Sequence, residues 1–299
     1  MNAFAYLLLC LIWGTTWLGI KITVQGLPPF LGASLRFVVA SVILFVILCL
    51  WKIPLKIRKK DAGVLVLSAF FLYVFDYGLI YWAETVVSAG VAAVFFTPFG
   101  IFTVLWTHFL IRNKPFRPNE LVGLVLGCLG MVILFYDQLM VTRFDRRVIL
   151  AAAALSLGAA GGSLSLVLVK KHLTKMNPLL LTFHQSWMGV LFLAAIGMIL
   201  ESDHSLRITG RVGIAILYLG ILGTSLAFVL YYRLLQTLSA LTLALIPYIT
   251  PIVALAADYL VFKETPTLRA AIGIVVIFLG IGLTQMKPGK LGPDGFSHG

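Results

Sequence analysis

Ten long, uninterrupted apolar stretches constrain this sequence more than any other feature. Each is about 20 residues long, the length that an α-helix needs to cross the hydrocarbon core of a bilayer. The stretches cover residues 3–25, 29–51, 61–83, 87–111, 119–136, 147–169, 177–200, 211–234, 238–262 and 269–286. Barrel strands are short and alternate in polarity, which excludes them here. With 61% hydrophobic and 11% charged residues, the chain is predicted to be an all-α membrane protein with ten transmembrane helices.

The positive charges indicate how these helices are oriented. Cytoplasmic loops of membrane proteins carry an excess of Lys and Arg. If the N-terminus is cytoplasmic, the cytoplasmic segments hold 14 of the 23 Lys and Arg residues, the outer loops hold seven, and Lys21 and Arg36 lie within spans. The outer Arg143–Arg147 cluster goes against this bias. We expect both termini in the cytoplasm, and no nucleic-acid partner despite the net charge of +12, because the charge lies mostly in short loops.

The second half of the sequence repeats the first. The matching positions are Thr97-Pro98 with Thr250-Pro251, Lys21 with Lys170, Pro29 with Pro178, Arg36 with Gln185, and Gly123 and Gly130 with Gly273 and Gly280. We therefore predict a first five-helix repeat over residues 1–138, a second over 147–286, and a flexible cytoplasmic tail over 287–299.

An odd number of helices per repeat decides the geometry. The second repeat must enter the membrane from the opposite face, which gives two inverted repeats. Inverted repeats with interrupted helices at matching positions are typical of transporters, whose substrate site lies in a central cavity near the midplane. A duplicated scaffold that transports nothing is the alternative.

Motifs across nearly the whole chain resemble those of a known transporter superfamily. They are Trp13-Gly14-Thr15-Thr16-Trp17, Lys21, Pro29 and Arg36-Phe37 in the first half, and Tyr232, Ser239-Ala240, Pro251, Glu264 and Gly273 in the second. The chain resembles the drug/metabolite transporter superfamily, in its ten-span EamA-type branch. Within it, the sequence looks most like the YddG-type exporters of aromatic and other amino acids.

Three departures from the family pattern weaken the assignment to one subfamily more than they weaken the fold prediction. Lys263 replaces the Gly of the usual Gly-Glu pair, Asn113-Lys114 stands where the first half would carry that pair, and Gly161-Gly162-Ser163 replaces a second Trp-Gly opening. The resemblance implies export of small metabolites from the cytoplasm across a bacterial inner membrane. It also implies a cavity enclosed mainly by the first, third, fourth, sixth, eighth and ninth spans.

Three prolines lie within the fourth and ninth apolar stretches. Pro98, Pro247 and Pro251 each lack an N–H and clash with the preceding turn, so a kink or local unwinding is expected near each. Freed carbonyls are tolerated at membrane depth only against protein or a water-filled cavity. These prolines are predicted as hinge or gating positions beside the cavity, with static kinks as the alternative.

Aromatic residues crowd the central stretches. Tyr and Trp at mid-depth need partners for their O–H and N–H groups, and a cavity that they line would suit aromatic or cationic solutes. The predicted cavity residues are Trp13, Trp17, Tyr77, Tyr81, Phe95, Phe99, Ser163, His184, Trp187 and Tyr248. Each has an alternative: the aromatic residues could face lipid or core, His184 could be a hydrogen-bonded core residue, and Ser163 could bond to its own helix.

Charged residues inside apolar stretches mark functional sites by default. Lys21, Arg36, Asp76 and Asp258 lie at similar depth on this topology. They could form ion pairs that open and close an outer gate. Alternatively, they could pair structurally, orient the helices and help to position a substrate carboxylate.

The fifth and tenth stretches, which carry the matching glycines, are predicted to be peripheral supports, packed between the halves or in an oligomer.

We expect a secondary transporter that exports amino acids by alternating access, acts as a monomer, and has a small-molecule substrate and membrane lipids as partners. No G-x-x-x-x-G-K-[ST] motif is present to bind ATP, and no catalytic residue, metal or cofactor is expected. The alternatives are a broad exporter of drugs or organic cations, a lipid flippase and, with least support, a membrane enzyme.

Overall fold

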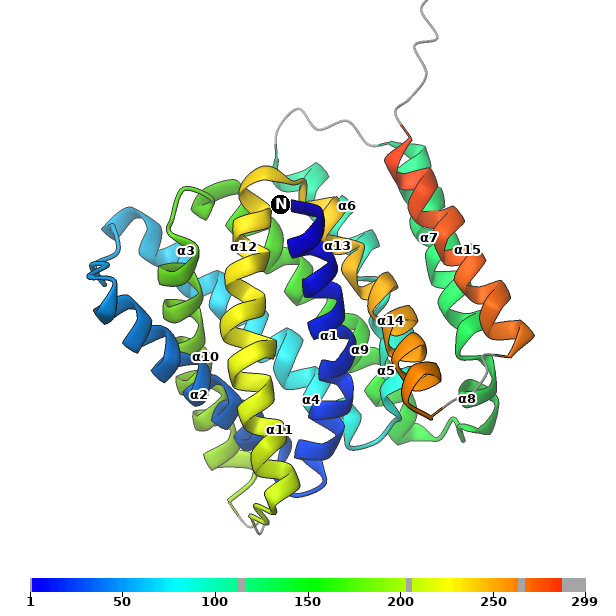
Figure 1. Cartoon of the computed structure of the whole chain (residues 1–299), viewed down its shortest axis with the longest axis horizontal. Helices are drawn as coiled ribbons and strands as arrows, with labels where there is room; N and C mark the ends of the chain where they lie inside the picture. The colour runs from blue at the N-terminus through cyan, green and yellow to red at the C-terminus, as the bar shows by residue number, and fades with distance from the viewer. Residues whose placement is uncertain (1, 112–116, 203–205, 263–266, 287–299) are drawn as a thin grey trace, which may run out of the picture.

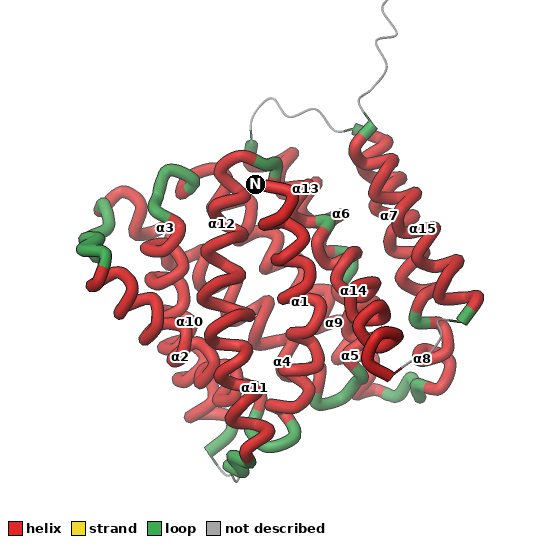
Figure 2. The backbone as a smooth tube through the Cα atoms, in the orientation of Figure 1, coloured by secondary structure: helices red, strands yellow, loops and turns green. Residues whose placement is uncertain are grey.

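The computed structural model describes residues 2–111, 117–202, 206–262 and 267–286, and within these residues the regular structure is entirely helical (Figures 1 and 2). Eight helical segments are long and apolar enough to cross a membrane. They are Asn2–Val24, Pro29–Leu50, Lys59–Glu84, Ala89–Leu110, Arg146–Leu173, Pro178–Leu200, Gly210–Thr237 and Leu268–Gln285. Shorter apolar helices occupy Pro118–Leu134 and Ala240–Val253. The all-helical prediction is confirmed for the described residues, and the count of ten spans stays a prediction.

Several of these segments contain more than one helix. In chain order the elements are α1 (Asn2–Val24), α2 (Pro29–Leu50), α3 (Lys59–Phe70), η1 (Phe71–Gly78), α4 (Leu79–Glu84), α5 (Ala89–Phe96), α6 (Phe99–Leu110), α7 (Pro118–Leu134), α8 (Tyr136–Val141), α9 (Arg146–Leu168), η2 (Val169–Leu173), α10 (Pro178–Leu200), α11 (Gly210–Gly220), η3 (Ile221–Leu226), α12 (Ala227–Thr237), α13 (Ala240–Ala244), α14 (Ile246–Phe262) and α15 (Leu268–Gln285). The predicted tail over 287–299 and the Lys263–Pro266 segment lie outside the described residues.

Local sequence sets where many of these helices begin. Proline is the first residue of α2, α7 and α10, a position where its missing N–H costs nothing. Ser88 and Ser239 each accept a hydrogen bond from a backbone N–H in the first turn of α5 and α13. These serine caps satisfy donors that a helix leaves free at its start.

The third and eighth predicted spans each contain a π-helical segment. In the first half, η1 lies between α3 and α4, and in the second half η3 lies between α11 and α12. Thr224 and Ser225 in η3 donate side-chain hydrogen bonds to carbonyls five residues back, at 2.9 Å each. π-Helical turns are uncommon and occur frequently at functional sites.

The fourth and ninth predicted spans are both interrupted. Thr97 and Pro98 separate α5 from α6, and Leu245 separates α13 from α14. The second interruption therefore lies ahead of Pro247, whereas Pro251 lies inside α14. The hydroxyl of Tyr248 donates to the carbonyl of Thr97 at 2.9 Å, so a residue of one interrupted helix satisfies the backbone at the break in the other.

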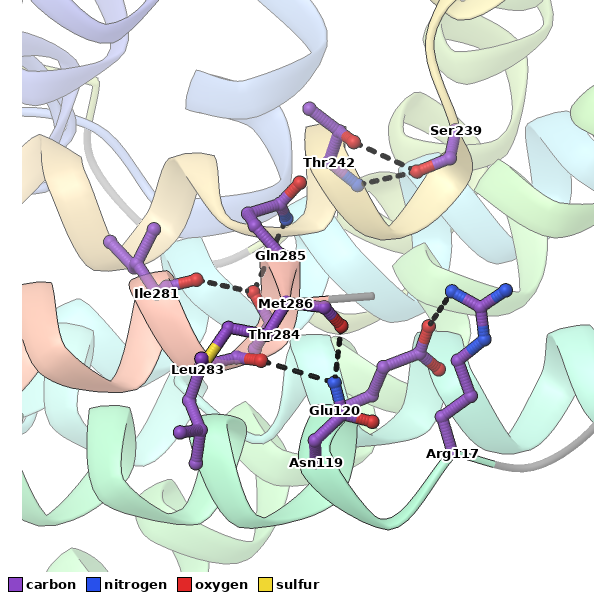
Figure 3. Close-up of polar contacts among 10 residues, drawn as sticks. All are labelled: Arg117, Asn119, Glu120, Ser239, Thr242, Ile281, Leu283, Thr284, Gln285 and Met286. Atoms are coloured by element: carbon purple, nitrogen blue, oxygen red, sulfur yellow. Dashed lines mark hydrogen bonds and ion pairs between the residues drawn. The ribbon is translucent and has the colours of Figure 1, made fainter. Parts of the chain in front are cut away.

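The helices α7 and α15 pack against each other at one edge of the molecule (Figure 1). A Cβ on Gly130 would lie 2.9 Å from the carbonyl oxygen of Gly273, and a Cβ on Gly123 would lie 2.5 Å from that of Gly280. This close approach is the packing that small residues permit between membrane helices. Asn119 also donates to the carbonyls of Leu283 and Met286, at 3.2 and 2.7 Å, at the end of α15 (Figure 3).

Candidate functional site

A central cavity of about 100 Å³ lies among helices from both halves of the chain. It is lined by Trp13, Thr16, Trp17, Ile20, Leu72, Asp76, Tyr77, Ile80, Phe96, Phe99, Gly162, Ser165, Leu166, Phe228, Tyr231, Tyr232, Leu243, Ile246, Pro247 and Thr250. These residues come from α1, η1, α4, α5, α6, α9, α12, α13 and α14. They belong to the six spans that the resemblance implies.

The lining is mostly aromatic on the side of α1 and α12. Trp13 lies 5.4 Å from Phe228 and 5.0 Å from Tyr231, measured between ring centroids. Its indole N–H donates to the carbonyl of Gly223 at 3.2 Å, which satisfies the polar atom away from water. Trp17 makes an edge contact with Phe96 at 5.9 Å. Apolar burial and ring stacking are thus the main contacts that this wall offers a solute.

The structure places the predicted site residues in two groups. Trp13, Trp17, Tyr77, Phe99, Pro247 and Asp76 line the cavity. Tyr81, Phe95, Ser163, His184, Trp187, Tyr248, Pro98, Pro251, Lys21 and Arg36 do not. A role in the substrate site for the second group stays a prediction.

Several residues of the second group make other contacts. Ser163 donates to the carbonyl of Ala160 in its own helix at 2.9 Å. Trp187 donates to Nδ1 of His184 at 3.0 Å, which leaves Nε2 to donate to the carbonyl of Leu55 at 2.8 Å. Tyr81 is fully buried, and the Phe95 ring lies 6.5 Å from that of Phe144.

Asp76 is the acidic residue of the cavity wall. It is buried at 6% exposure, and the structure gives its carboxylate no hydrogen bond or ion pair within the described part of the chain. Gly162 of α9 lies directly against it, because a Cβ at that position would overlap the Asp76 carboxylate. An unpaired carboxylate in an aromatic wall favours binding of a cation.

Arg36 lies behind the same wall. Its side chain is fully buried, its Nε donates to Thr224 at 3.1 Å, and its guanidinium carbon lies 4.9 Å from the centroid of the Tyr77 ring. Lys21 points elsewhere and donates to the carbonyls of Glu84 and Val87, at 2.5 and 2.9 Å.

Lys21, Arg36 and Asp76 form no ion pair with one another in the part of the chain that the structure describes. The ion pairs found there join Arg58 to Asp61, Arg117 to Glu120 and Arg269 to Asp137. The side chain of Asp258 lies outside the described part of the structure. Lys21 and Arg36 are held by carbonyls, a hydroxyl and aromatic rings instead, because their long side chains reach those groups within the helix bundle.

Sequence reasoning missed two features of this region. Glu84 is fully buried and its carboxylate oxygens have no hydrogen-bond partner, but the predicted third span ended at residue 83. Phe228 and Tyr231 line the cavity from α12, and the apolar stretch around them gave no signal of which face points inward.

Among the described residues, no group of three His, Cys, Asp or Glu side chains is placed to hold a metal ion.

Comparison with known families decides the kind of protein. A model of the EamA-like transporter family matches two segments of the chain, residues 1–136 and 149–286. The chain belongs to the EamA-like transporter family. This is a family of multi-pass membrane transporters, and the apolar helices of the chain agree with that membership.

Curated relatives of this EamA-like transporter extend over nearly its full length. An uncharacterized transporter, YoaV of Bacillus subtilis strain 168, is 24% identical over 91% of this chain and 92% of its own length. Protein PecM of Dickeya dadantii strain 3937 is 27% identical over 95% and 92%. A solved crystal structure is 18% identical, covers 95% of this chain and 97% of its own, and has a TM-score of 0.78, which shows a shared fold.

Proposed function

We propose that this EamA-like transporter is a bacterial inner-membrane secondary transporter that exports amino acids, aromatic ones included, by alternating access. It acts as a monomer in the lipid bilayer, with both termini in the cytoplasm. The observation that carries the proposal is the central cavity, which has an aromatic wall and one unpaired carboxylate, that of Asp76.

Two features support an internal repeat, which an odd number of spans per half would make inverted, the arrangement on which alternating access in many transporters rests. The family model matches each half of the chain separately. In addition, Lys170 donates to the carbonyls of Leu235 and Leu238 at 2.7 and 2.8 Å, a contact with the end of α12 that corresponds to the contact of Lys21 with the end of α4.

The chemistry of the cavity supports an amphipathic amine as the solute. The ammonium group would bind near Asp76, and an apolar side chain would pack against Trp13, Trp17 and Phe228. Burial of an aromatic side chain and attraction of the ammonium to ring faces both contribute to such binding.

Counterflow in proteoliposomes tests the proposal. Vesicles that contain purified protein and a high internal concentration of unlabelled amino acid are expected to take up the same amino acid in labelled form. Asp76→Asn is expected to reduce this uptake at least about tenfold, the loss of one charged contact, whereas Asp137→Asn, which removes an exposed carboxylate paired with Arg269, should leave it unchanged. Absence of uptake for every amino acid by folded protein would contradict the substrate assignment.

Export of organic cations is a second candidate function. The lack of an ion-pair partner for Asp76 among the described residues favours it, because an unpaired carboxylate in an aromatic wall suits any apolar cation. Labelled quaternary ammonium compounds in the same vesicles separate the two functions. Their uptake without uptake of any amino acid would favour the second.

A further inference from the structure

The guanidinium of Arg36 has an unusual environment. The side chain is fully buried, and neither Nη1 nor Nη2 has a hydrogen-bond partner. Only Nε meets hydrogen-bond geometry, with Thr224, and the buried Tyr81 hydroxyl lies beside the guanidinium. A buried charged group left without partners carries a large desolvation cost, and each such group in a native structure requires an explanation.

The position in the second half that corresponds to Arg36 carries no such desolvation cost. Gln185 is the residue that aligns with Arg36 on the proposed repeat, and it is also fully buried. Its amide nitrogen donates to Ser68 at 2.8 Å, and its amide oxygen accepts from Tyr232. A neutral amide therefore satisfies this position of the fold, and helix packing alone does not demand the positive charge of Arg36.

Arg36 lies within reach of the central cavity. Its guanidinium packs over Tyr77, which lines the cavity. A Cβ on Gly223 would lie 3.2 Å from Nη2 of Arg36 and 3.0 Å from the methyl group of Thr16, another lining residue. Movement of the Tyr77 ring or of Thr16 would uncover the free N–H groups.

A charge of opposite sign adjoins the same ring. Asp76 precedes Tyr77 in η1 and faces the cavity, and Tyr77 is the residue whose ring Arg36 packs over. No ion pair joins Arg36 to Asp76. One cavity wall thus offers a cationic donor and an anionic acceptor that do not neutralise each other by direct contact.

We propose that Arg36 binds the carboxylate of the transported solute while Asp76 binds its ammonium group, so that the site selects zwitterions. The inference rests on the proposed function and narrows its substrate class to free α-amino acids. Two N–H groups of a guanidinium fit the two oxygens of a carboxylate, a geometry that favours arginine over lysine. A solute without the carboxylate would leave Arg36 unpaired.

A panel of four related solutes tests the inference in binding and counterflow assays with the full chain. The solutes are phenylalanine, its methyl ester, 2-phenylethylamine and 3-phenylpropionate. Wild-type protein is expected to bind phenylalanine about 10- to 100-fold more tightly than the other three, the effect of one charge-assisted hydrogen-bonded contact. A similar affinity for 2-phenylethylamine and phenylalanine would overturn the inference but leave transport of amines intact.

Three variants test whether Arg36 causes the preference for phenylalanine over 2-phenylethylamine. Arg36→Gln, which copies the residue of the second half, should abolish the preference for phenylalanine over 2-phenylethylamine, and Arg36→Lys should restore part of it. Arg269→Gln is the matched control, because this exposed arginine also packs over a tyrosine, at 4.9 Å, and pairs with an aspartate.

Each remaining outcome is decisive. Unchanged discrimination by a folded Arg36→Gln variant would overturn the inference. The wild-type panel decides the matter even if that variant does not fold. Wild-type protein that binds none of the four solutes but takes up other amino acids would overturn the inference for aromatic zwitterions and leave the proposed function intact, whereas absence of uptake for every amino acid would overturn both.

Discussion

At the scale of single residues, Gly162 controls the position of the cavity carboxylate. The backbones of Gly158 and Gly162 in α9 allow η1 to approach closely, and the Asp76 carboxylate occupies the space where a side chain on Gly162 would stand. The close packing of α9 against η1 therefore depends on residues without a Cβ, and the orientation of Asp76 depends on it too.

Gly162→Ala is expected to displace Asp76 and to impair solute uptake severalfold or more. Overpacking of a tight contact also costs about 1–3 kcal/mol of stability. Uptake in proteoliposomes and thermal unfolding in detergent measure the two effects. Gly213→Ala is the control: no atom lies within 4 Å of a Cβ there, so it should keep full uptake and gain up to about 1 kcal/mol from helix propensity. Normal uptake by Gly162→Ala would contradict this account of Asp76.

Residue types alone could predict part of the site. The sequence marks Asp76 because an acidic residue inside an apolar stretch is rare, and it marks Trp13 and Trp17 because they share a helix face. It does not predict that Gly162 would meet Asp76, or that Tyr248 would pack on Thr97, because such contacts arise between distant segments. Glu84 was missed because a charge near the end of a stretch looks like a loop residue.

At the scale of helices, two lysines hold equivalent helix ends. Lys21 binds the carbonyls of Glu84 and Val87, at the end of α4 and in the turn that follows it. Lys170 binds those of Leu235 and Leu238, at the end of α12 and just after it. A cation at a helix C-terminus satisfies free carbonyls and interacts favourably with the helix dipole. The two contacts fix the turn that leads into each interrupted helix.

Lys21→Met and Lys170→Met are each expected to destabilise the protein by about 1.5–3 kcal/mol, the net value of hydrogen bonds to a charged group. Thermal unfolding in detergent should show similar losses for both. Lys171→Met removes an exposed lysine next to Lys170 and should change little. A large loss for one of the two variants and none for the other would contradict their equivalence.

The helices were more predictable than their irregularities. Long apolar stretches, with Pro29, Pro118 and Pro178 at helix starts, are local signals, and helices follow them closely. The segments η1 and η3 and the break at Leu245 depend on which carbonyl each N–H meets in the packed bundle. Pro251 lies inside α14, so no break in the helix occurs there, and the kink that the sequence predicts at this position stays a prediction.

At the scale of the whole molecule, the proposed alternating access depends on how the two halves are arranged. The cavity takes residues from both matched family segments, so relative movement of the halves would change access to it. Alternating access needs such movement to expose the cavity to one side at a time. The orientation of the second half in the membrane is therefore the property that most needs measurement.

Cysteine labelling in intact cells measures that orientation. Lys59 and Gly210 are the first residues of α3 and α11, and both are exposed. In a variant whose Cys10, Cys49 and Cys128 are replaced by serine, a membrane-impermeant maleimide should label Gly210→Cys from outside. It should label Lys59→Cys only after the membrane is permeabilised, because an odd number of spans per half places the two helix starts on opposite faces. Labelling of both positions from the same side would exclude the inverted repeat, and alternating access through it.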